Sequence, residues 1–223
     1  MGPPSPVVHQ PVVHQPTLLG AQDPRPARSP VWERVALDAE SWVDVAREWW
    51  LGADVLADEL IGRVPWRQGR RRMWDRMVDD PRLSYWTGAR GPSLHPALDE
   101  MRAAIERRYR VRLRPPGFNF YRDGQDSVAW HADRELRELD DTIIAIVTLG
   151  ARRPFLLRPA RGGPSIDLAP ASGDLLVMGG ATQREWEHAV PKTARPGRRV
   201  SVSWRWTRSP APIRTDTHFW LDP

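Results

Sequence analysis

The chain has 223 residues, 40% of them hydrophobic, which is sufficient for one domain with a real core. Its net charge is +5, and it contains no cysteine, which excludes disulfides, zinc–thiolate sites and cysteine nucleophiles. No apolar run has the length of a membrane span, and we expect no secretory signal. We therefore expect a cytoplasmic monomer with no membrane partner.

Nearly all of the positive charge is arginine, because Lys192 is the single lysine. Clustered arginines neutralise phosphates and stack on bases, which favours a polyanionic partner. A GC-rich genome would enrich arginine without any such function. The positions of the arginines must therefore decide between the two explanations.

Residues 1–30 are rich in proline and repeat the pentapeptide Pro-Val-Val-His-Gln, which predicts a disordered or extended tail. We expect one domain over residues 31–207, in which residues 31–112 form a nucleic-acid-recognition part. Residues 208–223 are expected to be a C-terminal extension.

The segment after this tail predicts a short amphipathic helix over 53–61 and then a basic cluster over Arg63–Arg76. Arginines interleaved with wedge or stacking side chains are typical of nucleic-acid-binding surfaces. The alternative is a solvated face whose two tryptophans are packed in the core. The side chains that we predict to contact substrate are Trp66, Arg67, Arg70, Arg71, Arg72 and Trp74, and Met73 is a further candidate wedge.

Residues 81–92 carry Tyr85 and Trp86 between turn-forming residues and predict a loop, either packed or acting as a lid with a stacking aromatic. A helix is expected from His95 to about Tyr109, with Ser93 as a possible cap.

From Phe118 onward, short strands alternate with turn signals such as Arg-Asp-Gly and Gly-Gly-Pro. This pattern predicts a barrel or jelly roll with helices packed outside it, a mostly β (α+β) fold. The expected strands are 118–121, 127–130, 142–148, 154–157, 165–168, 175–178, 186–190 and 199–206.

A possible metal site lies at the end of the second of these strands. His131 and Asp133 are two positions apart, so on an extended strand both side chains face the same way. His188, on a later strand, can supply a third ligand. Two imidazoles and one carboxylate form the facial triad that suits non-haem Fe(II) and leaves coordination positions open. A lone histidine is more often structural, so this interpretation depends on the order of the motifs.

The last expected strand carries Arg199 and Arg205 on one face, together with Ser201 and Ser203. Arginines inside a barrel are costly to bury without anionic partners, and a dicarboxylate offers two. The strand between them spans roughly 20 Å, so both side chains would have to lean inward. One of them could instead pair with a surface carboxylate.

The ordered combination Asn-x-Tyr (119–121), Arg-Asp-Gly (122–124), His-x-Asp-x-Glu (131–135), a distal histidine and Arg-x-Ser-x-Ser-x-Arg (199–205) resembles the AlkB family of Fe(II)/2-oxoglutarate dioxygenases. The resemblance covers about residues 64–207 and is densest from Phe118. It implies a double-stranded β-helix (jelly-roll) core, Fe(II), 2-oxoglutarate as cosubstrate and O₂.

The same resemblance implies a role for each motif residue. His131, Asp133 and His188 would be the catalytic Fe(II) ligands. Arg199, helped by Tyr121, would bind the distal carboxylate of 2-oxoglutarate, and Arg205 and Asn119 the end beside the metal. Glu135 would face the damaged base. Ser201 stands where several relatives carry asparagine, and its hydroxyl can still donate a hydrogen bond.

The function implied is oxidative demethylation of alkylated bases, of the 1-methyladenine and 3-methylcytosine type, in DNA. Such a reaction releases formaldehyde, succinate and CO₂. An RNA or protein demethylase or hydroxylase on the same scaffold is the alternative. A nucleic-acid-binding module with a purely structural barrel is a third hypothesis, and it predicts no bound iron.

Overall fold

The computed structural model describes residues 23–208 apart from positions 74, 89–90, 134–135, 137–138, 140 and 195–196, and it describes only the backbone of Arg71 and Met73. The helices are α1 (Ala53–Arg63), α2 (Pro96–Tyr109) and the single turn α3 (Thr182–Glu185). The strands are β1 (Arg25–Pro26), β2 (Val31–Ala36), β3 (Ser41–Arg47), β4 (Trp50–Leu51), β5 (Arg67–Met73), β6 (Arg76–Trp86), β7 (Gly117–Tyr121), β8 (Val128–His131), β9 (Thr142–Gly150), β10 (Leu156–Pro159), β11 (Ile166–Asp167), β12 (Leu175–Gly180), β13 (Trp186–Val190) and β14 (Arg199–Thr207).

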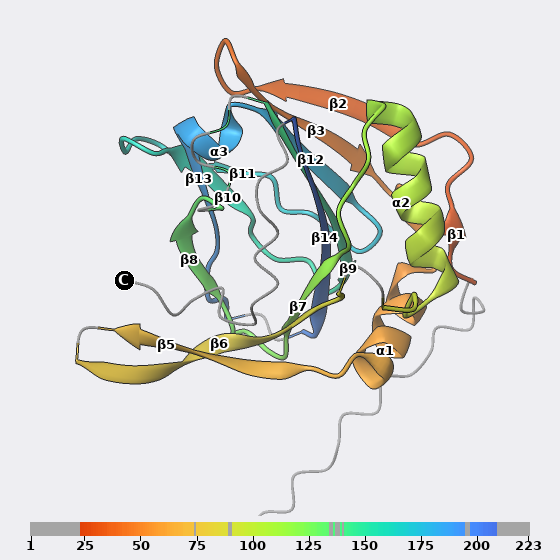
Figure 1. Cartoon of the computed structure of the whole chain (residues 1–223), viewed down its shortest axis with the longest axis horizontal. Coiled ribbons are helices and arrows are strands. Elements are labelled where there is room, and N and C mark those ends of the chain that lie inside the picture. The colour runs from red at the N-terminus through yellow and green to blue at the C-terminus, as the bar shows by residue number, and fades with distance from the viewer. Residues whose placement is uncertain are drawn as a thin grey trace, which may run out of the picture.

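Two antiparallel sheets form the body of the molecule (Figure 1). The larger has eight strands in the order β2-β3-β12-β9-β14-β7-β6-β5, and the smaller has four in the order β11-β10-β13-β8. Strands far apart in sequence lie side by side in both, as in a jelly roll. The predicted mostly β fold is therefore confirmed.

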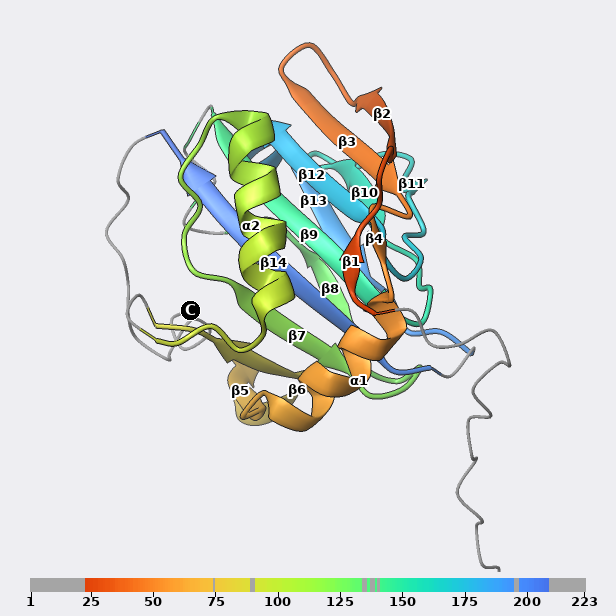
Figure 2. The same ribbon diagram turned by 90° about the vertical axis from the view of Figure 1, so that its right-hand side faces the viewer.

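Side-chain alternation along the central strands separates two cores. On β14, Val200, Val202 and Trp204 point to the outer face of the large sheet, where they belong to the same buried cluster as residues of α1 and α2. Figure 2 shows both helices lying across this face. On β9, Ile144 and Ile146 point the other way, into the core beneath the small sheet. The inner face is therefore the one on which a site between the sheets can form.

The predicted strands from Phe118 onward agree with the structure to within two residues at most boundaries, and the 186–190 strand agrees at both ends. Both predicted helices are present, but the cap of α2 is His95, whose Nδ1 accepts a hydrogen bond from the amide of Ala97 at 3.1 Å. Ser93 is therefore not the cap.

One expectation about the N-terminal half is wrong. Residues 81–86 form the second half of β6 and not a loop, because Leu83 and Tyr85 pack against the outer core while the residues between them face inward. Within the predicted tail, Arg25–Pro26 is extended and pairs with Trp50–Leu51. The rest of the predicted tail, residues 1–22, lies outside the described residues.

None of the helices in the described part of the chain is long and apolar enough to cross a membrane.

Candidate metal and cosubstrate site

Three side chains that could bind a metal meet on the small sheet. His131 ends β8 and is the register partner of His188 on β13, while Asp133 follows β8 by two residues. One ligand atom from each residue lies within 4.8 Å of the other two. The pairing of two strands thus brings together residues 57 positions apart in the sequence, as the motif predicted.

Both imidazoles are held in the neutral form that a metal requires. His131 lies with Nδ1 2.9 Å from the carbonyl oxygen of Ala129, and burial lowers its pKa. A donating Nδ1 leaves Nε2 as the ligand atom. The His188 ring stacks on Phe155 and is 7% exposed, and burial, with the neighbouring His131, lowers its pKa to about 3.

Asp133 is ionised although its side chain is only 13% exposed. Burial alone would raise the pKa of the carboxyl, but the Arg205 guanidinium, with Nε 2.5 Å from Oδ2, lowers it to about 2. Gln183, on α3 and 1% exposed, accepts a hydrogen bond from the amide of Asp133 at 2.9 Å. The ligand is therefore fixed through both its side chain and its backbone.

The donor set fits a divalent iron. Two neutral nitrogens and one carboxylate oxygen on one side of a metal match the facial arrangement that Fe(II) oxygenases use. The Nδ1 atom of His188 is buried and has no hydrogen-bond partner in the described structure, so no hydrogen bond at this nitrogen competes with a metal ion.

Arg199 fits a buried carboxylate. Its side chain is 0% exposed, and only Nη2 is bonded, to Oγ1 of Thr148 at 3.2 Å. Among the described atoms, Nε and Nη1 have no partner. The guanidinium lies 5.4 Å from the Tyr121 ring centre, and burial lowers its pKa to about 10. A buried cation with unsatisfied donors is the complement of an anionic ligand.

The other predicted cosubstrate residues surround the metal ligands. Asn119 and Ser201 are register partners on β7 and β14, and both line the same pocket as His131 and Asp133. Oδ1 of Asn119 accepts a hydrogen bond from Arg82 Nε at 2.9 Å. Arg205 reaches this pocket directly, whereas Arg199 lies deeper, beside Tyr121. Both arginines are on the inner face, as the alternation predicted.

Three pocket residues come from the segment that was expected to be a loop. Arg82, Ser84 and Trp86 line the pocket from β6. Trp86 is 40% exposed, and the centre of its ring lies 4.7 Å from the Arg205 guanidinium. The indole also covers Gly117, where any side chain would collide with it. The alternation of Leu83 and Tyr85 with these residues was the signal that could have found them.

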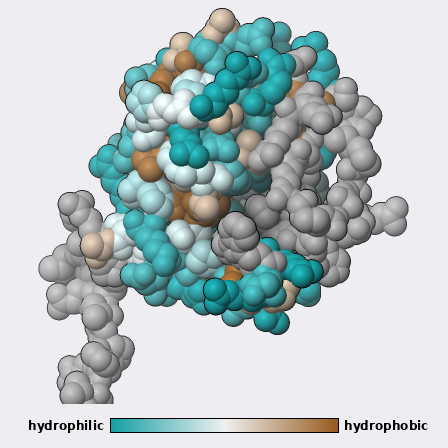
Figure 3. Space-filling view, turned by 90° about the vertical axis from the view of Figure 1, so that its left-hand side faces the viewer, coloured by the Kyte–Doolittle hydropathy of each residue, from teal (hydrophilic) through white to brown (hydrophobic). Residues whose placement is uncertain are grey.

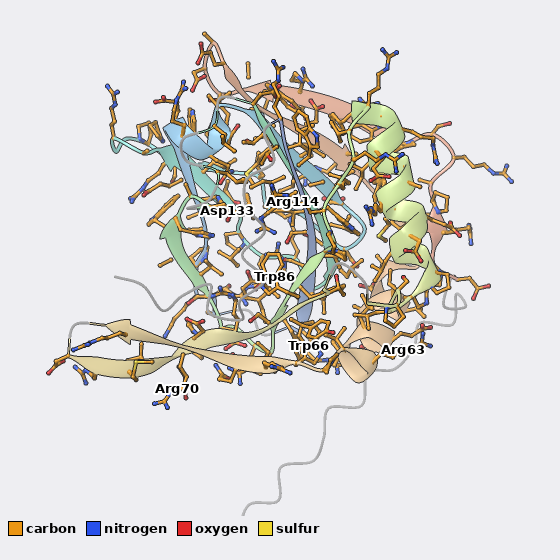
Figure 4. All side chains as sticks on the ribbon, in the orientation of Figure 1. Arg63, Trp66, Arg70, Trp86, Arg114 and Asp133 are labelled. Atoms are coloured by element: carbon orange, nitrogen blue, oxygen red, sulfur yellow. The ribbon has the colours of Figure 1, made fainter. Side chains whose placement is uncertain are left out.

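The predicted substrate-contacting arginines lie on the β5–β6 hairpin, which extends beyond the body of the molecule (Figure 1). Arg67, Arg70 and Arg72 are exposed, and Figure 4 shows Arg70 pointing away from the body. Arg70 pairs with Asp79 at 3.1 Å. The face of the molecule in Figure 3 is mostly hydrophilic, with apolar surface only in small separate areas.

Trp66 does not occupy a position that supports a wedge or stacking role. Its indole Nε1 donates to the carbonyl of Ile61 at 3.1 Å, and its ring packs against Phe118 and Phe120. The alternative interpretation, a tryptophan packed in the core, describes this residue. Glu135 and Trp74 lie outside the described residues, as does the side chain of Arg71.

Comparisons with known proteins agree with this geometry. The family model of the 2OG-Fe(II) oxygenase superfamily matches residues 87–209. The chain is 33% identical over 174 residues to "Alpha-ketoglutarate-dependent dioxygenase alkB homolog 3" of Rattus norvegicus, covering 69% of this chain and 59% of the relative. It is 30% identical over 191 residues to "DNA oxidative demethylase ALKBH2" of Arabidopsis thaliana, covering 66% and 60%. The chain thus spans about 60% of the length of these relatives.

A solved prolyl hydroxylase of Trichoplax adhaerens, in complex with a hypoxia-inducible factor peptide, has the same fold. Its TM-score is 0.50 at 12% sequence identity, covering 69% of this chain and 79% of that one. The chain belongs to the 2OG-Fe(II) oxygenase superfamily, whose members use Fe(II), 2-oxoglutarate and O₂. Its curated relatives confirm the resemblance to the AlkB branch of that superfamily.

Proposed function

We propose that this protein is an Fe(II)- and 2-oxoglutarate-dependent dioxygenase that removes methyl groups from alkylated bases in DNA. The observation that carries the proposal is the pairing of a His-Asp-His cluster with a fully buried arginine whose Nε and Nη1 lack partners in the described structure. The names of the two relatives support the same reaction class. A monomeric, cytoplasmic enzyme is part of the proposal.

His131, Asp133 and His188 would hold the iron, and Arg199 would hold the distal carboxylate of 2-oxoglutarate with Tyr121 beside it. Arg205, Asn119 and Ser201 line the same pocket and would orient the end of the cosubstrate nearest the metal. When bound, iron, 2-oxoglutarate and O₂ supply the oxidising chemistry. In the overall reaction 2-oxoglutarate would lose CO₂ and become succinate with one oxygen atom of O₂, and the methyl carbon would leave as formaldehyde with the other. The ring nitrogen of the cationic methylated base would regain its lone pair as a proton is released.

The enclosed position of the metal ligands requires the target base to leave the double helix or to be presented in a single strand. Trp86 stands at the edge of the pocket with part of its ring exposed, so one face of a base can stack there. Glu135 keeps its predicted role facing the base.

The β5–β6 hairpin supports a nucleic-acid substrate more than a protein substrate. The side chains of Arg67, Arg72 and Arg76 are exposed and form no hydrogen bond or ion pair with a described residue, so they are available to phosphates. They lie on β5 and β6, and the second half of β6 lines the pocket. A strand of nucleic acid held by the hairpin is therefore directed to the metal.

The test is incubation with Fe(II), 2-oxoglutarate and ascorbate of matched DNA and RNA oligonucleotides that carry one 3-methylcytosine. Mass spectrometry should show loss of the methyl group, faster on DNA, and none with Asp133→Ala, which loses an iron ligand. Faster reaction on RNA would favour the alternative substrate. Iron-loaded protein that demethylates neither would refute the proposal.

A further inference from the structure

A second basic run, separate from the β5–β6 hairpin, lies where α2 ends. Residues 107–114 read Arg-Arg-Tyr-Arg-Val-Arg-Leu-Arg, with five arginines and no carboxylate. Arg107 and Arg108 are in the last turn of α2, where a cation stabilises the helix. Arg110 is the C-cap residue and Arg112 lies beyond the helix, so the helix dipole does not account for Arg112.

These arginines border a surface groove of about 580 Å³, which we call the α2 groove. Its volume is within the range of roughly 300–1,000 Å³ typical of ligand pockets. Its lining residues are Ala103, Glu106, Arg107, Arg110, Val111, Arg112 and Trp206. The groove therefore combines a partly apolar floor, one indole and three guanidinium groups.

The positive charge of the α2 groove is uncompensated within the described structure. Arg107, Arg110 and Arg112 are exposed, and none of their side chains forms a hydrogen bond or ion pair with a described residue. Glu106 is the one carboxylate in the lining, and its Oε1 already accepts from Arg102 Nε at 3.2 Å and from the amide of Leu113 at 2.8 Å.

The other two arginines of the run are directed elsewhere. Arg108 lies over the Trp32 ring, 3.6 Å from its centre, and Arg114 donates to Oγ1 of Thr207 at 3.1 Å. The amide of Arg114 also donates to the carbonyl of Arg205 at 2.8 Å. These contacts fix the segment that follows α2 against the end of β14, so the groove is a formed feature of the surface.

The α2 groove lies close to the mouth of the catalytic pocket. Arg205 and Trp206 are consecutive on β14 and therefore face opposite sides, Arg205 the pocket and Trp206 the groove. Residues 112–116 run beside this end of β14, and the amide of Thr87, next to Trp86, donates to the carbonyl of Pro116 at 3.2 Å. In the view of Figure 4, Arg114 lies between α2 and Asp133.

We propose that the α2 groove binds the sugar–phosphate backbone of the single strand that flanks the target base, with one base stacked on Trp206. Unpaired guanidinium groups beside an aromatic ring, here the partly exposed indole of Trp206, are the combination that holds single strands without sequence preference. This inference rests on the proposed function for its choice of nucleic acid over an acidic polypeptide. The proposal implies that the enzyme binds a longer stretch of single strand than the catalytic pocket alone would contact.

The test compares Arg110→Ala/Arg112→Ala with the control Arg28→Ala/Arg198→Ala, which removes the same charge from exposed positions elsewhere. Fluorescence anisotropy measures binding of unmodified single-stranded DNA of 5 and 30 nucleotides over a range of salt concentrations. For the 30-mer, the groove variant should bind at least about tenfold more weakly than the control, with a salt slope smaller by roughly 1.4. Binding of the 5-mer should not differ between the two.

Trp206→Ala should weaken 30-mer binding by about 5- to 150-fold without changing the salt slope. Equal binding of the 30-mer by the groove variant and the control would overturn the inference. So would a groove-dependent affinity for poly-glutamate without any groove-dependent affinity for DNA. Because binding of unmodified DNA needs no turnover, a failure of catalysis with intact groove-dependent binding would refute only the demethylase proposal.

Discussion

Arg199→Met tests the cosubstrate site because it keeps an unbranched stem and removes the guanidinium with its charge. Removal of one partner from a buried charge pair costs about 3–5 kcal/mol. Since Arg199 is fully buried, we expect 2-oxoglutarate to bind roughly 150- to 5,000-fold more weakly. Isothermal titration with Mn(II) in place of Fe(II) measures this affinity without turnover.

The same substitution should stabilise the protein in the absence of 2-oxoglutarate. Burial lowers the pKa of Arg199 from its ordinary value to about 10, which corresponds to a cost of roughly 3 kcal/mol for holding the charge in the folded state. Below pH 10 the folded and unfolded states both bind this proton, so the cost is constant near neutral pH. It is relieved only as pH rises above about 10, because there the unfolded state binds more protons.

Arg198→Met is the matched control, since Arg198 is the neighbouring arginine, has a side chain 54% exposed and pairs with Asp58 on the surface. It should leave both the affinity for 2-oxoglutarate and the melting temperature nearly unchanged. The reasoning is refuted if Arg199→Met binds 2-oxoglutarate as tightly as the control does.

Three further substitutions test other parts of the site. Trp86→Ala should lower kcat/KM for a methylated oligonucleotide by about 5- to 150-fold through lost stacking, while Trp86→Phe retains most of the activity; equal loss in both would argue against stacking. Gln183→Leu removes the acceptor for the Asp133 amide and should weaken metal binding by about 10- to 100-fold in a titration, whereas unchanged affinity would show that Gln183 does not position the ligand. Asp126→Asn should destabilise the protein by about 1–3 kcal/mol in urea denaturation at pH 7. Arg122 lowers the pKa of Asp126 against the effect of burial, so this difference is present above about pH 4 and should shrink as pH falls through the folded-state value; a difference independent of pH would contradict the assignment.

The second half of the chain could be predicted well because its strands carry their own signals. Each has alternating or continuous apolar residues between turn residues, and β14 shows Val200, Val202 and Trp204 alternating with polar positions. His131 and Asp133 are close in sequence, so their joint position followed from strand geometry. His188 was found from the order of the motifs, since its pairing with His131 depends on strand register.

The N-terminal half was harder to predict because tertiary contacts determine its structure. The turn residues that border 81–92 suggested a loop, yet β6 pairs with both β5 and β7. The bond from Arg82 to Asn119 joins two segments that have no local relation in sequence. Trp66 and Trp86 are both tryptophans near arginines in the sequence, which does not distinguish their positions. Trp66 is packed against Phe120, whereas Trp86 lies partly exposed at the pocket.

The central claim is that one metal site couples 2-oxoglutarate to removal of a methyl group from a base. A single-turnover reaction on single-stranded DNA with one 3-methylcytosine, measuring succinate and formaldehyde together, tests it most directly. The account predicts equal amounts of the two products from the wild-type enzyme and neither from Asp133→Ala. Succinate without formaldehyde on every alkylated DNA tested, or full activity of Asp133→Ala, would contradict it.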